Sequence, residues 1–179
     1  MNDETMLWRT RPPSSYAPTG KVLTVPAQTL VRTAAVLRAA GAVESACLWL
    51  GSLDEAGNGL VKALVVPMQV NRPRNYSMPG SAMLGVAEFA RAQSWTVVGA
   101  IHSHPGVGVE HSTYDDEMTP SRRAVSIVMP RYGEWSGPWP RGLGIHAYFE
   151  KYWHLLSDEH ARQRVILTDA VEVQTFNLR

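Results

Sequence analysis

The sequence predicts a single domain of the α/β or α+β class, built on a mixed β-sheet. Strand-type apolar runs alternate with two segments of helical periodicity in the first half of the chain, and strand-type runs dominate the second half. A length of 179 residues fits one domain, and 45% hydrophobic residues can fill its core. We expect residues 1–20, which are rich in proline and serine, to form an irregular arm, and residues 21–179 to form the domain.

Short apolar runs between turn residues predict the strands. In chain order the predicted strands are Lys21–Val25, Glu44–Leu50, Leu60–Val70, Trp95–His102, Ala124–Met129, Ile145–Phe149, Tyr152–Leu155, and one or two more within Val165–Phe176. Gly51 is expected to end the second of these strands. Pro67 predicts a bulge or a sheet edge in the third, because proline has no N–H for the ladder. The polar segment Asn71–Gly80 is expected to be a loop.

Two segments carry apolar residues at helical spacing, Ala27–Ala40 and Ser81–Gln93. Pro26 suits the first turn of the first helix, because the N–H that proline lacks would have no partner there. Ser81 is the expected N-cap of the second helix. A shorter, capped helical turn is expected over Ser157–Gln163.

The composition argues against several classes of function. Seventeen lysines and arginines against sixteen acidic residues give a net charge of +1, which argues against a protein held to nucleic acid by phosphate contacts. Cys47 is the one cysteine, so neither an intrachain disulfide nor a cysteine-rich zinc ribbon can form. No apolar run approaches the ~18 residues of a membrane-spanning helix, and the acidic start does not resemble a secretory signal. We expect a cytoplasmic protein without nucleic-acid or membrane partners.

The segment with the clearest chemistry reads His-Ser-His-Pro and begins at the end of a predicted strand. Residues two apart on a strand point to the same face, so His102 and His104 can present both imidazoles to one metal ion. After the break at Pro105, Ser112 opens a predicted helical turn, and Asp115 can direct its carboxylate back at the imidazoles. Two imidazoles and a carboxylate suit zinc with one position left for water, which is typical of catalytic sites.

Glu44 is the candidate base for such a site. It stands at the head of an otherwise apolar strand, where a carboxylate is costly unless it has a partner or a task. A water acidified by zinc to a pKa near ~7 still needs a group that takes its proton. Each feature alone has a simpler interpretation: a His-x-His pair of ordinary histidines, helix capping by Ser112 and Asp115, and a strand-edge Glu44. Their conjunction favours the metal site, and capping would hold Asp115 in place.

The arrangement resembles the JAMM motif of the JAB/MPN zinc metalloproteases. The motif is carried by His102-x-His104-Pro105, the seven residues from Pro105 to His111, and Ser112-x-x-Asp115. The family also has a glutamate at the start of a short apolar segment that ends in glycine seven positions later, as Glu44 and Gly51 do here. The likeness spans about residues 20–130. Cys47 departs from the family, which often has glycine there, but this change removes no catalytic group.

The resemblance implies a curved mixed sheet flanked by helices, of the MPN and cytidine-deaminase-like type, with zinc at one edge. The implied site is one Zn²⁺ per chain with a water as fourth ligand, held by His102, His104 and Asp115, with Glu44 as general acid and base and Ser112 as a donor to the oxyanion. The implied reaction is cleavage of the isopeptide or peptide bond after the C-terminal glycine of a ubiquitin-like protein. The size is similar to bacterial stand-alone members, some of which accompany activating and conjugating enzymes for such a modifier.

Two other functions remain open at the level of sequence. A non-catalytic MPN scaffold would only bind partners, but scaffolds generally lack a zinc ligand or the glutamate, and none is missing here. A hydrolase of the same chemistry could instead act on a sulfur-carrier protein or a small-molecule amide.

Other residues near the motif receive simpler interpretations. His111 is interpreted as a loop residue that touches substrate, and His146 and His154 as structural or surface histidines. Cys47 is expected to be an inert buried thiol. The Trp135–Trp139 loop is expected to cover the core rather than to bind a partner.

Overall fold

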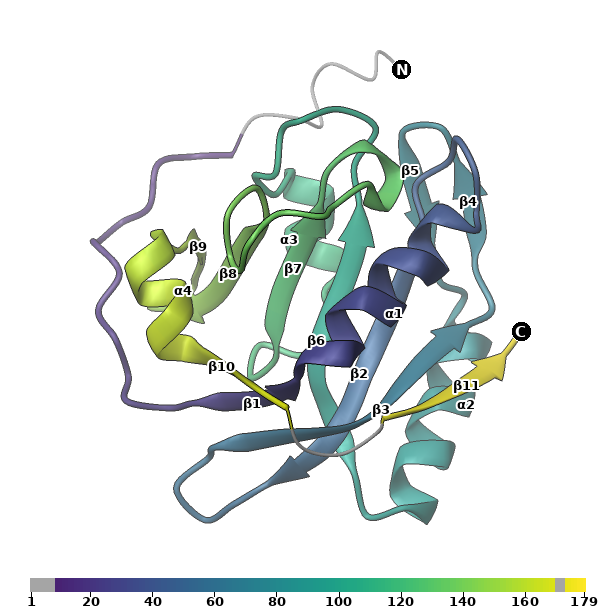
Figure 1. Cartoon of the computed structure of the whole chain (residues 1–179), viewed down its shortest axis with the longest axis horizontal. Helices are drawn as coiled ribbons and strands as arrows, with labels where there is room; N and C mark the ends of the chain where they lie inside the picture. Colours follow the sequence, from purple (N-terminus) through teal and green to yellow (C-terminus); the bar gives the residue numbers. More distant parts are fainter. Residues whose placement is uncertain (1–8, 170–172) are drawn as a thin grey trace.

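The computed structural model describes residues 9–169 and 173–179 (Figure 1). Its strands are, in chain order, β1 (Leu23–Pro26), β2 (Ala46–Leu53), β3 (Gly59–Pro67), β4 (Val70–Arg72), β5 (Asn75–Ser77), β6 (Thr96–Ser103), β7 (Val125–Met129), β8 (Gly144–Phe149), β9 (Tyr152–Leu155), β10 (Val165–Thr168) and β11 (Gln174–Leu178). Its α-helices are α1 (Ala27–Arg38), α2 (Gly80–Ala92), α3 (Thr113–Met118) and α4 (Asp158–Arg164). No helix among the described residues has the length and apolar character needed to cross a membrane.

A mixed sheet with the strand order β10-β1-β3-β2-β6-β7-β8-β9 forms the centre of the structure, and β11 pairs with β3. The central strands β2 and β6 are antiparallel, whereas β6 and β7 are parallel. Strands β4 and β5 form a separate hairpin. The α/β class with a mixed sheet, predicted from the sequence, is confirmed.

The two long helices cover opposite faces of the sheet, with α1 in front and α2 behind in Figure 1. Leu30 and Leu37 of α1 belong to the same buried cluster as Trp49 of β2. Val86 of α2 belongs to a second cluster with Leu48. Because successive side chains of a strand point to opposite faces, a continuous apolar run in β2 can serve both cores.

Strand β2 differs from the predicted strand Glu44–Leu50 at both ends. It begins at Ala46, which leaves Glu44 in the connection before it, and it continues past Gly51. A Cβ atom at Gly51 would lie 2.0 Å from the carbonyl oxygen of Leu60. This glycine therefore permits a close approach of β3 and does not end the strand.

The segment Asn71–Gly80, expected to be a loop, instead contains most of the β4–β5 hairpin. The predicted strand Leu60–Val70 is split accordingly, because β3 ends at Pro67 and β4 begins three residues later. Pro79, and not Ser81, occupies the N-cap position of α2, and no side chain caps this helix.

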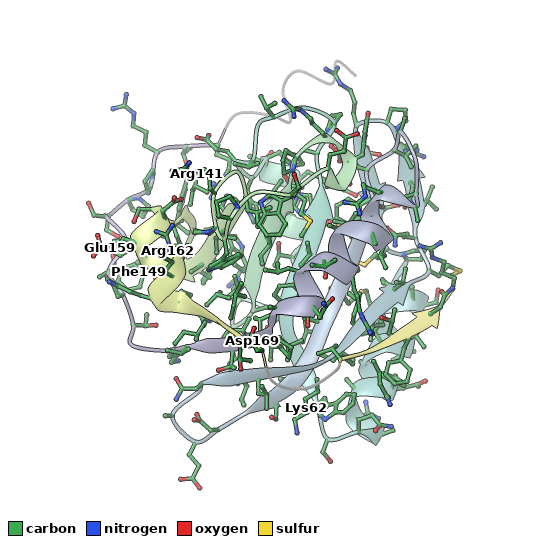
Figure 2. The ribbon with its side chains drawn as sticks, viewed as in Figure 1. Lys62, Arg141, Phe149, Glu159, Arg162 and Asp169 are labelled. Atoms are coloured by element: carbon green, nitrogen blue, oxygen red, sulfur yellow. The ribbon has the colours of Figure 1, made fainter. Side chains whose placement is uncertain are left out.

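The described part of the N-terminal arm, residues 9–20, has no helix or strand but is anchored on the second half of the chain. In Figure 1 it passes β9 and α4 before it enters β1. Tyr16 packs edge-on against Phe149, with ring centroids 5.8 Å apart, and also contacts His160 of α4. Figure 2 labels Phe149 on this side of the molecule. The first eight residues of the expected arm lie outside the described residues.

Candidate metal centre

The end of β6 brings two histidines together. His102 is 2% exposed and lies between two neighbouring strands, paired with Ala46 of β2 and Val128 of β7. His104 follows just after the strand, and its Nε2 lies 3.1 Å from Nε2 of His102. Both imidazoles therefore point to the same place, as the period of a strand predicts.

Helix α3 directs Asp115 at the two imidazoles. The Ser112 hydroxyl accepts from the Asp115 N–H at 3.2 Å, and Oδ2 of Asp115 accepts from the Ser112 N–H at 2.6 Å. This reciprocal capping box fixes the carboxylate beside β6. Its Oδ1 lies 3.2 Å from His102 Nε2 and its Oδ2 lies 3.4 Å from His104 Nε2. Asp115 thus caps its helix and is also placed to bind a metal ion.

These three side chains form a donor set that fits one metal ion. One ligand atom from each lies within 4.8 Å of the others, and no other such group occurs within residues 9–169 and 173–179. Nδ1 of His104 lies 3.0 Å from the Gly108 carbonyl oxygen. Because a carbonyl can only accept, Nδ1 carries a proton, which leaves Nε2 as the nitrogen that can bind a metal ion. Two imidazoles and one carboxylate are typical ligands of catalytic zinc.

The charges within the cluster support one another. Burial alone would raise the pKa of Asp115, but His102 and His104 outweigh it and hold that pKa below its ordinary value. Burial lowers the pKa of His104, yet the hydrogen bond and charge of Asp115 leave it raised. The carboxylate is therefore ionised at neutral pH, which is the form that binds a metal ion.

Glu44 lies beside the cluster, in the connection that leads into β2. Its side chain is buried, and its N–H donates to the Arg72 carbonyl of the hairpin at 2.8 Å. Burial raises the pKa of Glu44 from 4.5 to about 7, although His104 and Arg74 act to lower it. A carboxyl group that titrates near neutral pH can both take up and release a proton there.

A cavity of about 580 Å³ opens over the cluster. Its walls come from the Glu44 connection, from the β4–β5 hairpin, and from the loop and helix that follow β6. Glu44, His104, Ser112 and Asp115 line it together with Arg74 of the hairpin. The predicted base and two of the three predicted ligands, His104 and Asp115, thus face one space that a substrate can enter, whereas His102 does not line it.

The comparison with protein families agrees with this geometry. A family model described as prokaryotic homologs of the JAB domain matches residues 26–136. The chain belongs to this family. The match covers the Glu44 segment and the whole His102–Asp115 motif, so the resemblance inferred from the sequence is confirmed at the level of the family. Among curated proteins, none matches the chain in sequence.

Two solved structures are similar to this JAB domain in fold. Protein DSY2949 from Desulfitobacterium hafniense is 18% identical, with a TM-score of 0.64 over 84% of this chain and 96% of that one. A protein from Salinibacter ruber is 19% identical, with a TM-score of 0.52 over 75% of this chain and 88% of that one. Similarities at identities this low show a shared fold and give no information about activity.

Gln69 is a residue of the JAB domain whose role the sequence did not reveal. Its Oε1 accepts from the Ala46 N–H at 2.7 Å, and its Nε2 donates to the Ala46 carbonyl at 2.8 Å. The side chain therefore takes the place of a strand partner just beyond Pro67, where β3 ends. A polar amide soon after a strand-ending proline is the available sequence signal, and it is weak.

His111 does not line the cavity, contrary to the interpretation from the sequence as a residue that touches substrate. It is 3% exposed, its ring stacks on His146 with centroids 3.8 Å apart, and its Nδ1 lies 2.8 Å from Asp116 Oδ1. The sequence could not show this, because His146 comes from β8, 35 residues further along the chain. His111 is thus part of the support behind the metal centre.

Other buried groups match their simpler interpretations. His146 and His154 are buried among neighbouring rings, and neither belongs to the metal-ligand group. Cys47 is fully buried, and burial raises its pKa well above the range in which a thiolate would form. Trp135 and Trp139 pack, partly buried, against the larger core.

Proposed function

We propose that this JAB-domain protein is a zinc-dependent peptidase and isopeptidase that cleaves after the C-terminal glycine of a ubiquitin-like protein. The observation that supports it most is the convergence of His102, His104 and Asp115 within 4.8 Å, beside a cavity that Glu44 lines together with His104 and Asp115. The proposal includes a bacterial conjugation system as its setting, in which activating and conjugating enzymes act on the same modifier.

The metal ligands and Glu44 have separate roles in the hydrolysis. Zinc held by the three ligands would polarise the scissile carbonyl and acidify a water molecule. Glu44 accepts a proton from the attacking water and delivers it to the amine nitrogen as the C–N bond breaks, so the products are a carboxylate and a free amine. Its pKa of about 7 suits both directions of transfer.

Ser112 has two tasks in this proposal. Its hydroxyl donates to Asp115 Oδ2 at 2.8 Å and accepts from the Asp115 N–H, which stabilises the ligand and the helix. The residue also lines the cavity, and there the hydroxyl can turn to donate to the oxyanion that develops on the substrate.

The β4–β5 hairpin in the wall of the cavity supports an extended substrate. The β4–β5 hairpin forms one wall, and it is attached to the site through Glu44 N–H to the Arg72 carbonyl and through the Tyr114 hydroxyl to the Tyr76 carbonyl, at 2.6 Å. An extended tail can add to such a hairpin by backbone hydrogen bonds. Glycine at the scissile position has no side chain to collide with the metal ligands.

The test uses zinc-loaded protein and a ubiquitin-like modifier from the same genome, either extended by a short C-terminal peptide or joined to a lysine. Intact-mass analysis is expected to show release of the modifier ending in glycine, and a chelator is expected to block it. Glu44→Gln should lower turnover by about 10²-fold or more while keeping zinc. Glu55→Gln, at an exposed turn, is the matched control and should behave as wild type.

Metal analysis tests the metal site independently of the identity of the substrate. We expect about one zinc per wild-type chain and a sharp loss in His104→Ala, whereas His160→Ala, outside the site, should keep its zinc. Hydrolysis of small-molecule amides or of a sulfur-carrier protein, with every modifier fusion left intact, would replace the proposed substrate. Zinc binding with no hydrolysis of any amide would favour the non-catalytic scaffold.

A further inference from the structure

We propose that Arg9, in the N-terminal arm, is a positioning residue that holds helix α3 and its metal ligand through Asp116 and His111. The inference rests on the proposed function in one respect, namely that Asp115 binds a metal ion. It assigns a task in the metal centre to a segment that precedes the first strand.

Arg9 connects the arm to two separate elements. Its Nε donates to Oδ2 of Asp116 at 2.8 Å, and its Nη2 donates to the Trp153 carbonyl of β9 at 2.6 Å. The guanidinium carbon lies 4.2 Å from the centre of the Tyr152 ring, and the Tyr152 hydroxyl donates to the Thr10 carbonyl at 2.8 Å. The side chain of Arg9 is 12% exposed and that of Asp116 is 26% exposed, so this contact is a part-buried anchor rather than a fully exposed ion pair.

The second oxygen of Asp116 continues the connection inward. Its Oδ1 lies 2.8 Å from His111 Nδ1, and His111 Nε2 lies 2.8 Å from the Ser126 hydroxyl on β7. Because the carboxylate accepts, Nδ1 is the protonated nitrogen, and Nε2 accepts from Ser126. The His111 ring also stacks on His146 of β8. The chain of contacts therefore runs from the arm through α3 to two strands of the sheet.

The position of Asp116 makes this network relevant to the metal. Asp116 follows Asp115 directly on a helix of only six residues, and a helix this short depends on contacts with other elements in addition to its capping box. The Asp115 carboxylate turns to His102 and His104, while that of Asp116 turns to Arg9 and His111. Fixing one carboxylate therefore fixes the orientation in which α3 presents the other. His111 helps to fix the orientation of α3 in the same way, because it directly precedes Ser112, the capping residue of the helix.

Loss of the Arg9 guanidinium would leave a partly buried carboxylate without its cation. A charge in that position turns toward water, and the first turn of α3 would follow it. The consequence expected at the metal is a weaker and distorted site rather than an empty one, because all three ligands remain. Residues that support metal ligands typically change metal affinity by about 10–100-fold when removed.

The experiment measures Co²⁺ binding to metal-free protein, in affinity and in the visible absorption of the bound ion. Arg9→Ala is expected to raise the dissociation constant about tenfold and to change the intensity of the absorption bands. Arg11→Ala, an exposed arginine on the same arm, is the matched control and should change neither. Arg9→Lys should lie between wild type and Arg9→Ala, since it keeps the charge but not the planar fork.

A double-mutant cycle tests whether Arg9 acts through Asp116. Asp116→Asn should give a loss similar to that of Arg9→Ala, and the double variant should lose little more than either. Additive losses, or an Arg9→Ala protein that is folded and binds Co²⁺ as Arg11→Ala does, would overturn the inference while leaving the proposed function intact. Wild-type protein that binds no Co²⁺ would instead overturn the metal centre itself. Asp116→Asn keeps the test available should Arg9→Ala not fold.

Discussion

The side-chain amide of Gln69 forms both hydrogen bonds of a strand partner with the backbone of Ala46, at 2.7 and 2.8 Å. On its other side Ala46 pairs with His102. One amide therefore extends the sheet by one residue, next to the connection that carries Glu44 and to the metal ligand His102 on β6. A backbone N–H and a carbonyl buried here would otherwise have no partner.

Gln69→Ala is expected to lower both stability and turnover. The change leaves the Ala46 N–H and carbonyl without this partner, which costs about 1–3 kcal/mol of unfolding free energy. Because the same backbone carries Glu44, turnover should fall more than zinc content does. Chemical denaturation, zinc analysis and kinetics on one preparation check this. Met68→Ala, at the exposed neighbouring residue, should leave all three unchanged.

Gly144→Ala is expected to weaken metal binding from a distance. A Cβ at Gly144 would lie 1.9 Å from the Val109 carbonyl oxygen, so the loop between the metal ligands must shift. The adjacent Gly108 carbonyl holds Nδ1 of His104, and its displacement should weaken zinc binding about tenfold. Zinc titration against a competing chelator measures the effect. Gly108→Ala, where a Cβ meets open space, should titrate as wild type, and equal affinities in the two variants would contradict the account.

The parts of the site that could be predicted from the sequence depend on local geometry. His102 and His104 face the same side because a strand has a period of two, and Ser112 and Asp115 meet because a capping box joins residues three apart. The hydrophobic pattern likewise predicts the strands of the sheet and the two long helices. These relations extend over a few residues and are set by backbone geometry alone.

The parts that could not be predicted depend on contacts between distant segments. Gly51 is predicted to end its strand, and only the fold shows the close approach of Leu60. Gln69 falls within the predicted strand Leu60–Val70, and only the fold places its side chain beside Ala46. The β4–β5 hairpin is too short to show a strand period. His111 has a clear task only once β8 is folded against the motif. Tertiary packing decides each of these, and a single sequence does not display it.

Ser112→Ala separates the two tasks of this hydroxyl. Loss of the cap alone should lower stability by about 0.5–2 kcal/mol, because Asp115 N–H loses its acceptor. Loss of a donor to the oxyanion should in addition lower the rate by about 10²–10³-fold. We expect both effects, with the melting temperature and the turnover per folded, zinc-loaded molecule measured together. A lower melting temperature with unchanged turnover would assign Ser112 to capping alone.

The contribution of Glu44 to the stability of metal-free protein should fall as the pH rises toward neutrality. Burial raises the pKa of this carboxyl from 4.5 to about 7 in the folded chain, so between these values the folded state binds more protons than the unfolded state. The contribution of Glu44 to the unfolding free energy therefore declines between about pH 4.5 and 7 and is constant at higher pH. The expected decline is about 1–3 kcal/mol, and Glu44→Gln should lack it, which makes the variant more stable than wild type at pH 8.

Denaturation of chelator-treated wild type and variant at each pH measures the difference. Saturating zinc should reduce that difference, because a nearby cation favours the ionised carboxylate; a difference that does not change with pH would show that Glu44 titrates at its ordinary value.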